Sequence, residues 1–150
     1  MRGLIIQLPN ITGKNLWKLF NNINLSRYKW RVFFDEVLYN EDGVEKNSLF
    51  EHKIINDKDF LRRISQVSYY LIFLDIKAFP VHSDIDNVAT YDEFKTSQCE
   101  IVLLCSDSIF VNFYCKDKDI IQQVRENCLE NGFETEYLTE ENDGRLRLSV

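Results

Sequence analysis

The sequence predicts an α+β fold: a single, largely antiparallel or mixed sheet of about six to seven strands, with about three to four helices packed mainly on one face. Two observations support this fold class. Segments with a strand pattern outnumber those with a helix pattern, and several neighbouring strands are separated only by short turn sequences. Short turns join antiparallel strands, whereas a doubly wound α/β fold needs a crossover connection between parallel strands.

The length and composition indicate one domain spanning residues 1–150. Of the 150 residues, 45% are hydrophobic and 28% are charged, which suits a soluble chain with a large core. Size scaling predicts that about 69% of the surface of the extended chain is buried on folding. Such a core needs no disulfide or metal. No internal repeat and no linker divides the chain.

The N-terminal part predicts a strand, a helix and a second strand. Residues 3–8 are an apolar run that ends at a proline, which is typical of a strand. Thr12 is placed to cap a helix that carries Leu16 and Phe20 on one side. Residues 28–34 alternate apolar and polar side chains, as a half-buried strand does.

The apolar pattern of this second strand changes parity after residues 35–36, because Val37 and Tyr39 continue it. Side chains alternate with a period of two along a strand, so the change predicts a bulge or a bend. A turn sequence follows at residues 41–43, and residues 44–51 have no clear pattern.

The middle of the chain predicts a capped helix and a central strand. Asn56 or Asp57 can cap a helix over residues 57–67, whose apolar residues form one stripe. Residues 69–79 begin with a nearly continuous apolar run, which is typical of a strand covered on both faces.

A polar surface loop is expected at residues 80–88, followed by a short helix at residues 91–96. Thr90 and Glu93 have the spacing of a capping box.

Residues 99–115 predict a hairpin, because two apolar runs flank a polar turn. Aligning Leu103 with Val111 makes every odd-numbered pair apolar, as one buried face requires. The same register places Cys105 opposite Ile109, Ile101 opposite Phe113, and Cys99 opposite Cys115.

The C-terminal part predicts a helix and two strands. Asp117 can cap a helix over residues 118–128, and Gly132 is placed to end it. Residues 133–138 and 145–150 are expected to be strands, with a turn at Asp-Gly between them.

The charge distribution excludes several classes of partner. The net charge is -6, and the longest basic cluster is only Arg62–Arg63, so the sequence predicts no nucleic-acid binding. An acidic surface favours another protein as partner, and a basic one in particular. The longest apolar stretch stops at Asp75, which predicts no membrane span, and without a signal peptide we expect a cytoplasmic protein. Its four cysteines are then free thiols.

Several short segments resemble those of a known family. They are Thr90-Tyr-Asp-Glu-Phe94, Cys99-Glu-Ile-Val-Leu-Leu-Cys-Ser-Asp107, Val111-Asn-Phe-Tyr-Cys-Lys-Asp-Lys118, Leu138-Thr-Glu-Glu-Asn-Asp143, Gly3-Leu-Ile-Ile-Gln-Leu-Pro9 and Tyr28-Lys-Trp30. The chain resembles an uncharacterised family of small proteins from Bacillus and related Firmicutes, known as a domain of unknown function. The resemblance implies a bacterial cytosolic protein, of the kind found in neighbourhoods where toxin immunity proteins accumulate. It implies no catalytic residues, because the family has no assigned activity.

One candidate metal site is the loop that contains His82, Asp84 and Asp86, since imidazole and carboxylate groups are metal ligands. Their spacing matches no closed zinc site and no EF-hand loop. We therefore favour a solvated loop, and we expect neither a metal nor a cofactor.

Cys99, Cys115 and Asp75 are the other candidates for chemistry. The proposed register would permit a disulfide between the two cysteines, but in a reducing compartment we expect them to be small buried apolar groups. Asp75 interrupts an apolar strand, and a buried carboxylate there could serve acid–base chemistry. The favoured interpretation is that the strand emerges there, so that Asp75 meets solvent or the neighbourhood of Lys77.

Aromatic residues are a further feature of the sequence. Any of them could contribute to a binding patch, although core or partial burial is expected for each: Trp17, Tyr28, Trp30, Tyr70, Phe110 and Tyr114. Phe110 and Tyr114 fall on the even-numbered face of the hairpin. If helices cover the odd-numbered face, this second face has apolar groups that need cover.

The sequence favours a non-enzymatic protein of immunity or regulatory type that binds another protein. The alternative is a small enzyme or small-molecule binder with a pocket near residues 75–88. A third interpretation is a homodimer formed by an edge strand or by the even-numbered face.

Overall fold

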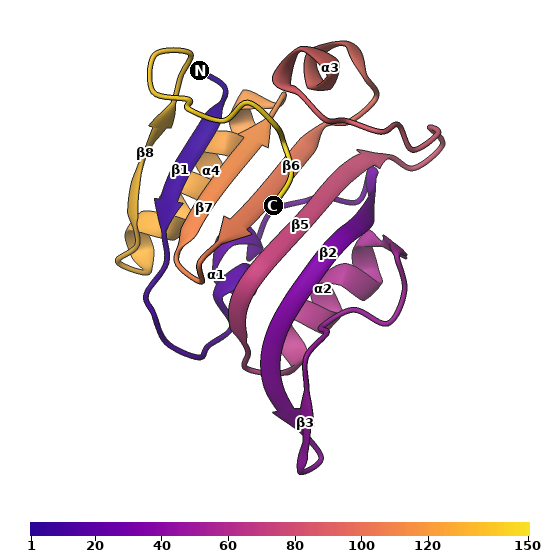
Figure 1. Cartoon of the computed structure of the whole chain (residues 1–150), viewed down its shortest axis with the longest axis vertical. Helices are drawn as coiled ribbons and strands as arrows, with labels where there is room; N and C mark the ends of the chain where they lie inside the picture. Colours follow the sequence, from indigo (N-terminus) through magenta and orange to yellow (C-terminus); the bar gives the residue numbers. More distant parts are fainter.

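The computed structural model describes residues 1–150 and has an open antiparallel sheet of eight strands (Figure 1). The strand order is β3-β2-β5-β6-β7-β1-β8, and β4 pairs with the first part of β2, whereas β3 pairs with its last part. The strands are β1 (Gly3–Gln7), β2 (Tyr28–Glu41), β3 (Val44–Lys46), β4 (Ile54–Asn56), β5 (Tyr70–Pro80), β6 (Ile101–Ser106), β7 (Phe110–Cys115) and β8 (Glu134–Leu138). The predicted α+β class is confirmed, with slightly more strands than expected.

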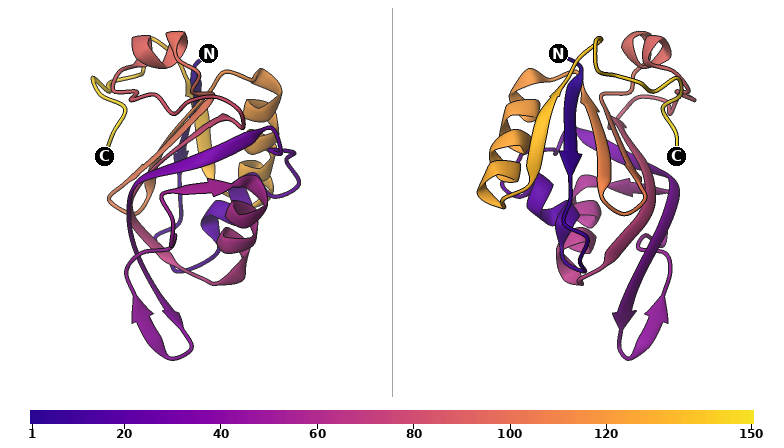
Figure 2. Two further views of the ribbon diagram at one scale, coloured as in Figure 1. Left: turned by 90° about the vertical axis from the view of Figure 1, so that its right-hand side faces the viewer. Right: turned by 60° about the vertical axis from the view of Figure 1, so that its left-hand side comes forward.

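The helices are α1 (Asn15–Phe20), α2 (Asp57–Gln66), α3 (Tyr91–Thr96) and α4 (Lys118–Glu130). Three of them, α1, α2 and α4, pack on one side of the sheet, which we call the helix face (Figure 2). On the opposite side, which we call the second face, α3 and the C-terminal segment lie over one end of the sheet only (Figure 1). None of the helices has the length and apolar character needed to cross a bilayer.

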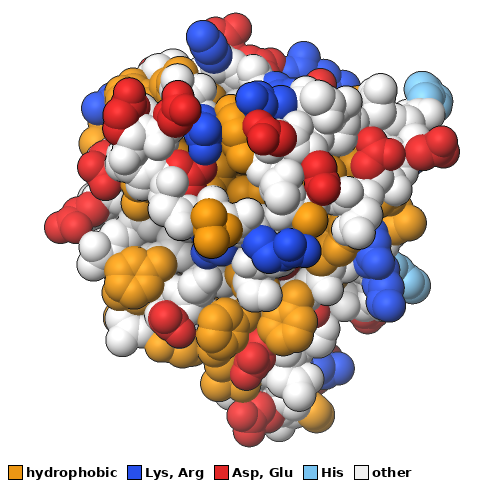
Figure 3. All heavy atoms as spheres, turned by 45° about the horizontal axis from the view of Figure 1, so that its top comes forward, with side chains coloured by type: hydrophobic (Ala, Val, Ile, Leu, Met, Phe, Trp, Pro, Cys, Tyr) orange, Lys and Arg blue, Asp and Glu red, His pale blue; other side chains and the backbone are white.

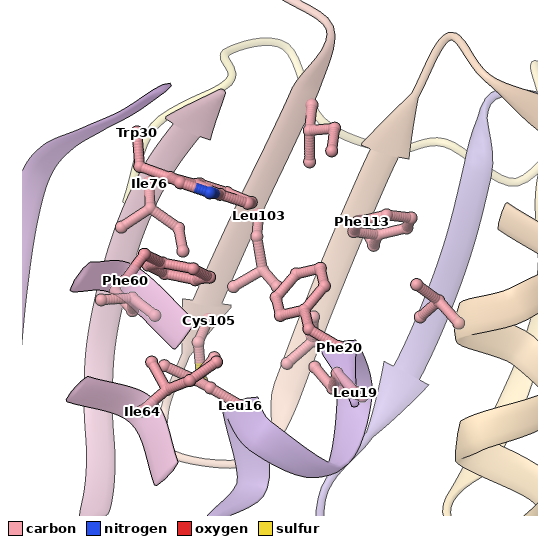
Figure 4. Packing of buried hydrophobic residues seen from close by; sticks show 14 of the residues in the cluster. Leu16, Leu19, Phe20, Trp30, Phe60, Ile64, Ile76, Leu103, Cys105 and Phe113 are labelled. Atoms are coloured by element: carbon pink, nitrogen blue, oxygen red, sulfur yellow. The ribbon is translucent and has the colours of Figure 1, made fainter. Parts of the chain in front are cut away.

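The main core lies between the sheet and the helix face. The rings of Trp30 and Phe60 are stacked with their centroids 4.2 Å apart, and Phe20 meets the ring of Trp30 edge-on at 5.5 Å (Figure 4). Aromatic pairs in these geometries stabilise a fold beyond the area they bury, by about 0.5–1.5 kcal/mol per pair. This cluster therefore fastens α1 and α2 to β2.

A second, smaller core lies on the second face. Val102, Leu104 and Tyr114 of the sheet are covered there by Phe94 of α3 and by Leu148 near the C-terminus. Two-sided burial explains why β6 is apolar at every position from residue 101 to residue 105.

Helix ends are set largely by the predicted caps. Asn56 and Asp117 accept hydrogen bonds from the first turns of α2 and α4, and Thr90 accepts one from Glu93 N in α3. Gly132 follows α4 with a φ of 72°, where a side chain would be strained. The Thr12 prediction is wrong: α1 begins at Asn15 without a side-chain cap.

The hairpin register is shifted by two residues from the predicted one. Ile101 pairs with Cys115 and Leu103 with Phe113, because the loop begins one residue later than expected. Asp107 and Ser108 take positive φ angles of 51° and 72° in that loop. Odd-numbered residues still face one side, so the predicted buried face is correct and the predicted partners are wrong.

Two further predictions concern irregular backbone. The bulge in β2 is confirmed, since its pairing with β5 shifts between Glu36 and Val37 and also between Val32 and Phe34. The predicted strand at residues 145–150 is wrong, because this segment crosses the second face without joining the sheet (Figure 1).

Candidate functional site

Strand pairing places the side chains of the second face in rows across the sheet. The first row contains Arg31, Lys77, Val102, Tyr114, Gly3 and Leu138. The second row contains Phe34, Asp75, Leu104, Asn112, Ile5 and Glu136. The third row contains Glu36 and Phe73 on β2 and β5, and Ser106, Phe110, Gln7 and Glu134 on the remaining strands.

The chain covers the first row and leaves much of the other two uncovered. Val102 and Tyr114 are buried, whereas 48% of Phe34 and 53% of Phe110 are exposed. Hydrophobic side chains reach the surface of this part of the molecule, with both acidic and basic side chains among them (Figure 3). We define the apolar patch as Phe34, Leu38, Tyr70, Phe73 and Phe110.

A buried ion pair lies beside the apolar patch. Lys77 Nζ is 2.6 Å from Asp75 Oδ1, and the two side chains are 2% and 5% exposed. They share a face because they are two residues apart on β5. The ring of Phe33, which occupies the bulge of β2, lies 4.4 Å from Lys77 Nζ. The expectation that Asp75 meets solvent is therefore wrong, whereas its expected association with Lys77 is confirmed.

The C-terminal segment is tied to the second face by polar contacts that sequence patterns did not reveal. The Asp143 carboxylate accepts hydrogen bonds from Arg2, from the Tyr114 hydroxyl and from Arg145 N. Burial, followed by the charge of Asp143, raises the pKa of Tyr114 well above its ordinary range. The Arg145 guanidinium donates to Asn112 Oδ1 at 2.7 Å.

His82, Asp84 and Asp86 line one shallow surface depression at the end of β5, together with Ser83 and Gln98. Asp86 accepts a hydrogen bond from Gln98 N. No group of three or more His, Cys, Asp or Glu side chains in the chain has an arrangement that could hold a metal ion.

The cysteines are all free and buried. Burial raises the pKa of the Cys99 and Cys115 thiols to about 12, and it does the same for Cys105 and Cys128. Cys99 belongs to the core of the second face and Cys115 to the core of the helix face. The predicted Cys99–Cys115 pairing is therefore wrong, because β6 places Ile101 opposite Cys115.

The aromatic candidates divide between core and surface. Tyr28, Trp30 and Tyr114 are buried and Trp17 and Tyr70 are half-buried, as expected. Phe110 is the most exposed of the six, at 53%. The structure thus brings Phe110 and Tyr70 together with Phe34, Leu38 and Phe73, which the sequence did not single out.

No solved structure matches this chain. An uncharacterised protein of Bacillus subtilis (strain 168), YncE, is 35% identical over 151 residues, which cover 99% of both chains. Residues 1–149 match the family described as protein of unknown function DUF2691. The resemblance to an uncharacterised Bacillus family is thereby confirmed, and the chain belongs to the DUF2691 family.

Proposed function

We propose that this protein is a non-enzymatic binding protein of immunity or regulatory type, and that it holds another protein against its apolar patch. The observation that carries the proposal is the exposure of Phe34 and Phe110 on the second face. The other end of this face is covered by α3 and the C-terminal segment. Phe34 and Phe110 lie three strands apart, or about 14 Å, so a single small side chain of a partner cannot cover both.

The composition of the patch is that of a protein interface. Aromatic side chains have large contact areas and few rotatable bonds, so they dominate the energies of many protein complexes. Burying apolar surface contributes about 25 cal/mol per Å², and Phe34 and Phe110 retain about half of theirs for this purpose.

The apolar patch is also preorganised, because the strands that carry it are part of the sheet. Its residues lie on β2, β5 and β7, and β5 and β7 are hydrogen-bonded to neighbouring strands on both sides. A preorganised surface binds with a smaller loss of conformational entropy than a loop does.

The alternative, a small-molecule site near residues 75–88, has weaker support. Asp75 is engaged by Lys77, whereas His82 and Asp84 lie in an open depression beyond the strand. A small-molecule site requires polar groups that converge inside a concave pocket.

Site-specific photocrosslinking tests the proposal. A benzoylphenylalanine is placed at Phe110 or, as a control, at Leu129 on α4, whose side chain is also 53% exposed. Irradiation of the native host cells should give a discrete adduct with another polypeptide from position 110 and none from position 129. Equal patterns from both positions, or no adduct at all, would contradict the proposal.

A further inference from the structure

We infer that the partner presents a basic surface, in which apolar side chains are flanked by lysine or arginine, and that acidic residues around the apolar patch select it. This inference rests on the proposed function and specifies the chemistry of the partner.

Most cations of the second face are already engaged within the chain, although Arg147, on the C-terminal segment that crosses this face, is exposed and forms no hydrogen bond or ion pair. Lys77 is paired with Asp75, and Arg31 donates to Val32 O. Arg145 donates to three acceptors, which are Asn112 Oδ1, Ser106 Oγ and Ser149 O. Of these cations, only Lys77 is neutralised by a carboxylate, whereas Arg31 and Arg145 are oriented by neutral oxygens and keep their positive charge.

The carboxylates around the patch have no such partners. Five exposed acidic residues form neither an ion pair nor a side-chain hydrogen bond: Glu36, Glu45, Asp107, Glu134 and Glu136. Glu36 lies on β2 between Phe34 and Leu38, and Asp107 lies in the turn that precedes Phe110. These five carboxylates outnumber Arg31, Arg145 and Arg147, the cations of this face that have no carboxylate partner, so the net charge around the patch is negative.

Two shallow grooves extend the patch, one on each side. On one side Leu38 and Tyr70 line a groove with Val67 and Glu45. On the other, Ile5 and Gln7 line a groove with Glu134 and Glu136. Each groove places at least one unpaired carboxylate beside an apolar side chain, which fits a segment that presents both apolar and basic side chains.

Charge complementarity also decides between a different protein and a second copy. Two copies packed patch to patch would bring the same unpaired carboxylates together, and like charges that face each other across an interface are unfavourable. Phosphate backbones are repelled for the same reason. Rim charges act chiefly on the rate of association and on its salt dependence.

Charge reversal in the crosslinking experiment tests this inference. With benzoylphenylalanine at position 110, the pair Glu134→Lys and Glu136→Lys is compared with the control pair Glu126→Lys and Glu130→Lys. The control residues are exposed on α4, form no ion pair, and change the net charge by the same amount. Thermal unfolding of the purified variants verifies that each is folded.

We expect the adduct yield to fall about tenfold in the first pair and to stay unchanged in the control pair, because only the first pair opposes a basic partner. Peptide sequencing of the adduct should identify a segment rich in lysine or arginine. Undiminished crosslinking in the first pair, or an acidic partner segment, would overturn the inference and leave the proposed function standing. An adduct of twice the chain mass would overturn the inference in favour of a second copy, and the absence of any adduct would overturn both proposals.

Discussion

Lys77 and Asp75 form a buried ion pair on the central strand β5, with 2.6 Å between Nζ and Oδ1. Asp75 is flanked by Phe34 on β2 and by Leu104 on β6, so the pair lies at the boundary between the covered and the uncovered parts of the second face. A charged group in such a place is tolerated only while its partner is present. The pair therefore makes the sheet beneath the apolar patch sensitive to single substitutions.

Replacing Lys77 alone should destabilise the protein strongly. Lys77→Met leaves the Asp75 carboxylate buried without its counter-ion, and we expect a loss of about 3–5 kcal/mol in the free energy of unfolding. The double variant Asp75→Leu/Lys77→Met removes both charges and should recover most of this loss. Urea denaturation measures both values. A single variant within about 1 kcal/mol of the parent would show that the pair contributes little.

Phe110 and Phe113 should respond in opposite ways to truncation, although they are close together on β7. Phe113 is fully buried in the helix-face core, so Phe113→Ala should cost about 3–5 kcal/mol. Phe110→Ser should change the unfolding free energy by at most about 1.5 kcal/mol, because about half of its side chain is already in solvent. The same denaturation measurements test both. A large loss for Phe110→Ser would mean that this residue supports the fold rather than a partner.

The β6–β7 hairpin shows which features of the fold apolar periodicity predicts and which it does not. Pairing Leu103 with Val111 or with Phe113 keeps every odd-numbered pair apolar, because a shift of two residues preserves the parity of side chains on a strand. Apolar periodicity therefore predicts the buried face but does not distinguish these two registers. The conformation of the loop sets the register, because Asp107 and Ser108 take positive φ angles there. An Asp-Ser sequence does not by itself predict that conformation.

The apolar patch could not be predicted from the sequence for a related reason. Alternation predicted that Phe110 lies on a second face in need of cover, and this is confirmed by the strand pairing. Which end of that face is covered depends on where residues 81–98, with the short helix α3, and the loop of residues 139–150 dock, and apolar periodicity does not predict docking. Leu148 anchors the C-terminal segment as a loop, although its neighbours alternate like a strand.

The buried thiols should make stability fall at alkaline pH. Burial raises the thiol pKa of Cys99 and Cys105 from 9.0 to about 12, so these groups stay protonated in the folded chain. The unfolded chain loses those protons above pH 9.0, which favours unfolding by up to about 1.4 kcal/mol per pH unit for each thiol. The stabilisation is thus complete below pH 9 and is lost as the pH rises towards 12.

Urea denaturation between pH 8 and pH 10, with a reductant present, measures this dependence. The Cys105→Ala variant is the control, and its stability should fall less steeply over the same interval because it has one thiol fewer to ionise. A profile that stays flat up to pH 10 would show that the thiols are accessible to water in the folded state.

Asp143 should prove to be the residue that holds the C-terminal segment on the second face. Its side chain is 2% exposed and accepts hydrogen bonds from Arg2 at 2.9 Å and from the Tyr114 hydroxyl at 3.0 Å. Asp143→Asn removes the negative charge that Arg2 faces, and we expect a loss of about 1–3 kcal/mol because charge-assisted hydrogen bonds are the stronger ones. Amide hydrogen exchange should accelerate in residues 139–150 and remain slow in β6 and β7, since those strands keep their backbone pairing. Glu140→Gln, at an exposed position of the same segment, should change neither quantity. If exchange in residues 139–150 were unaltered by Asp143→Asn, the burial of Leu148 alone would account for the docking of the segment.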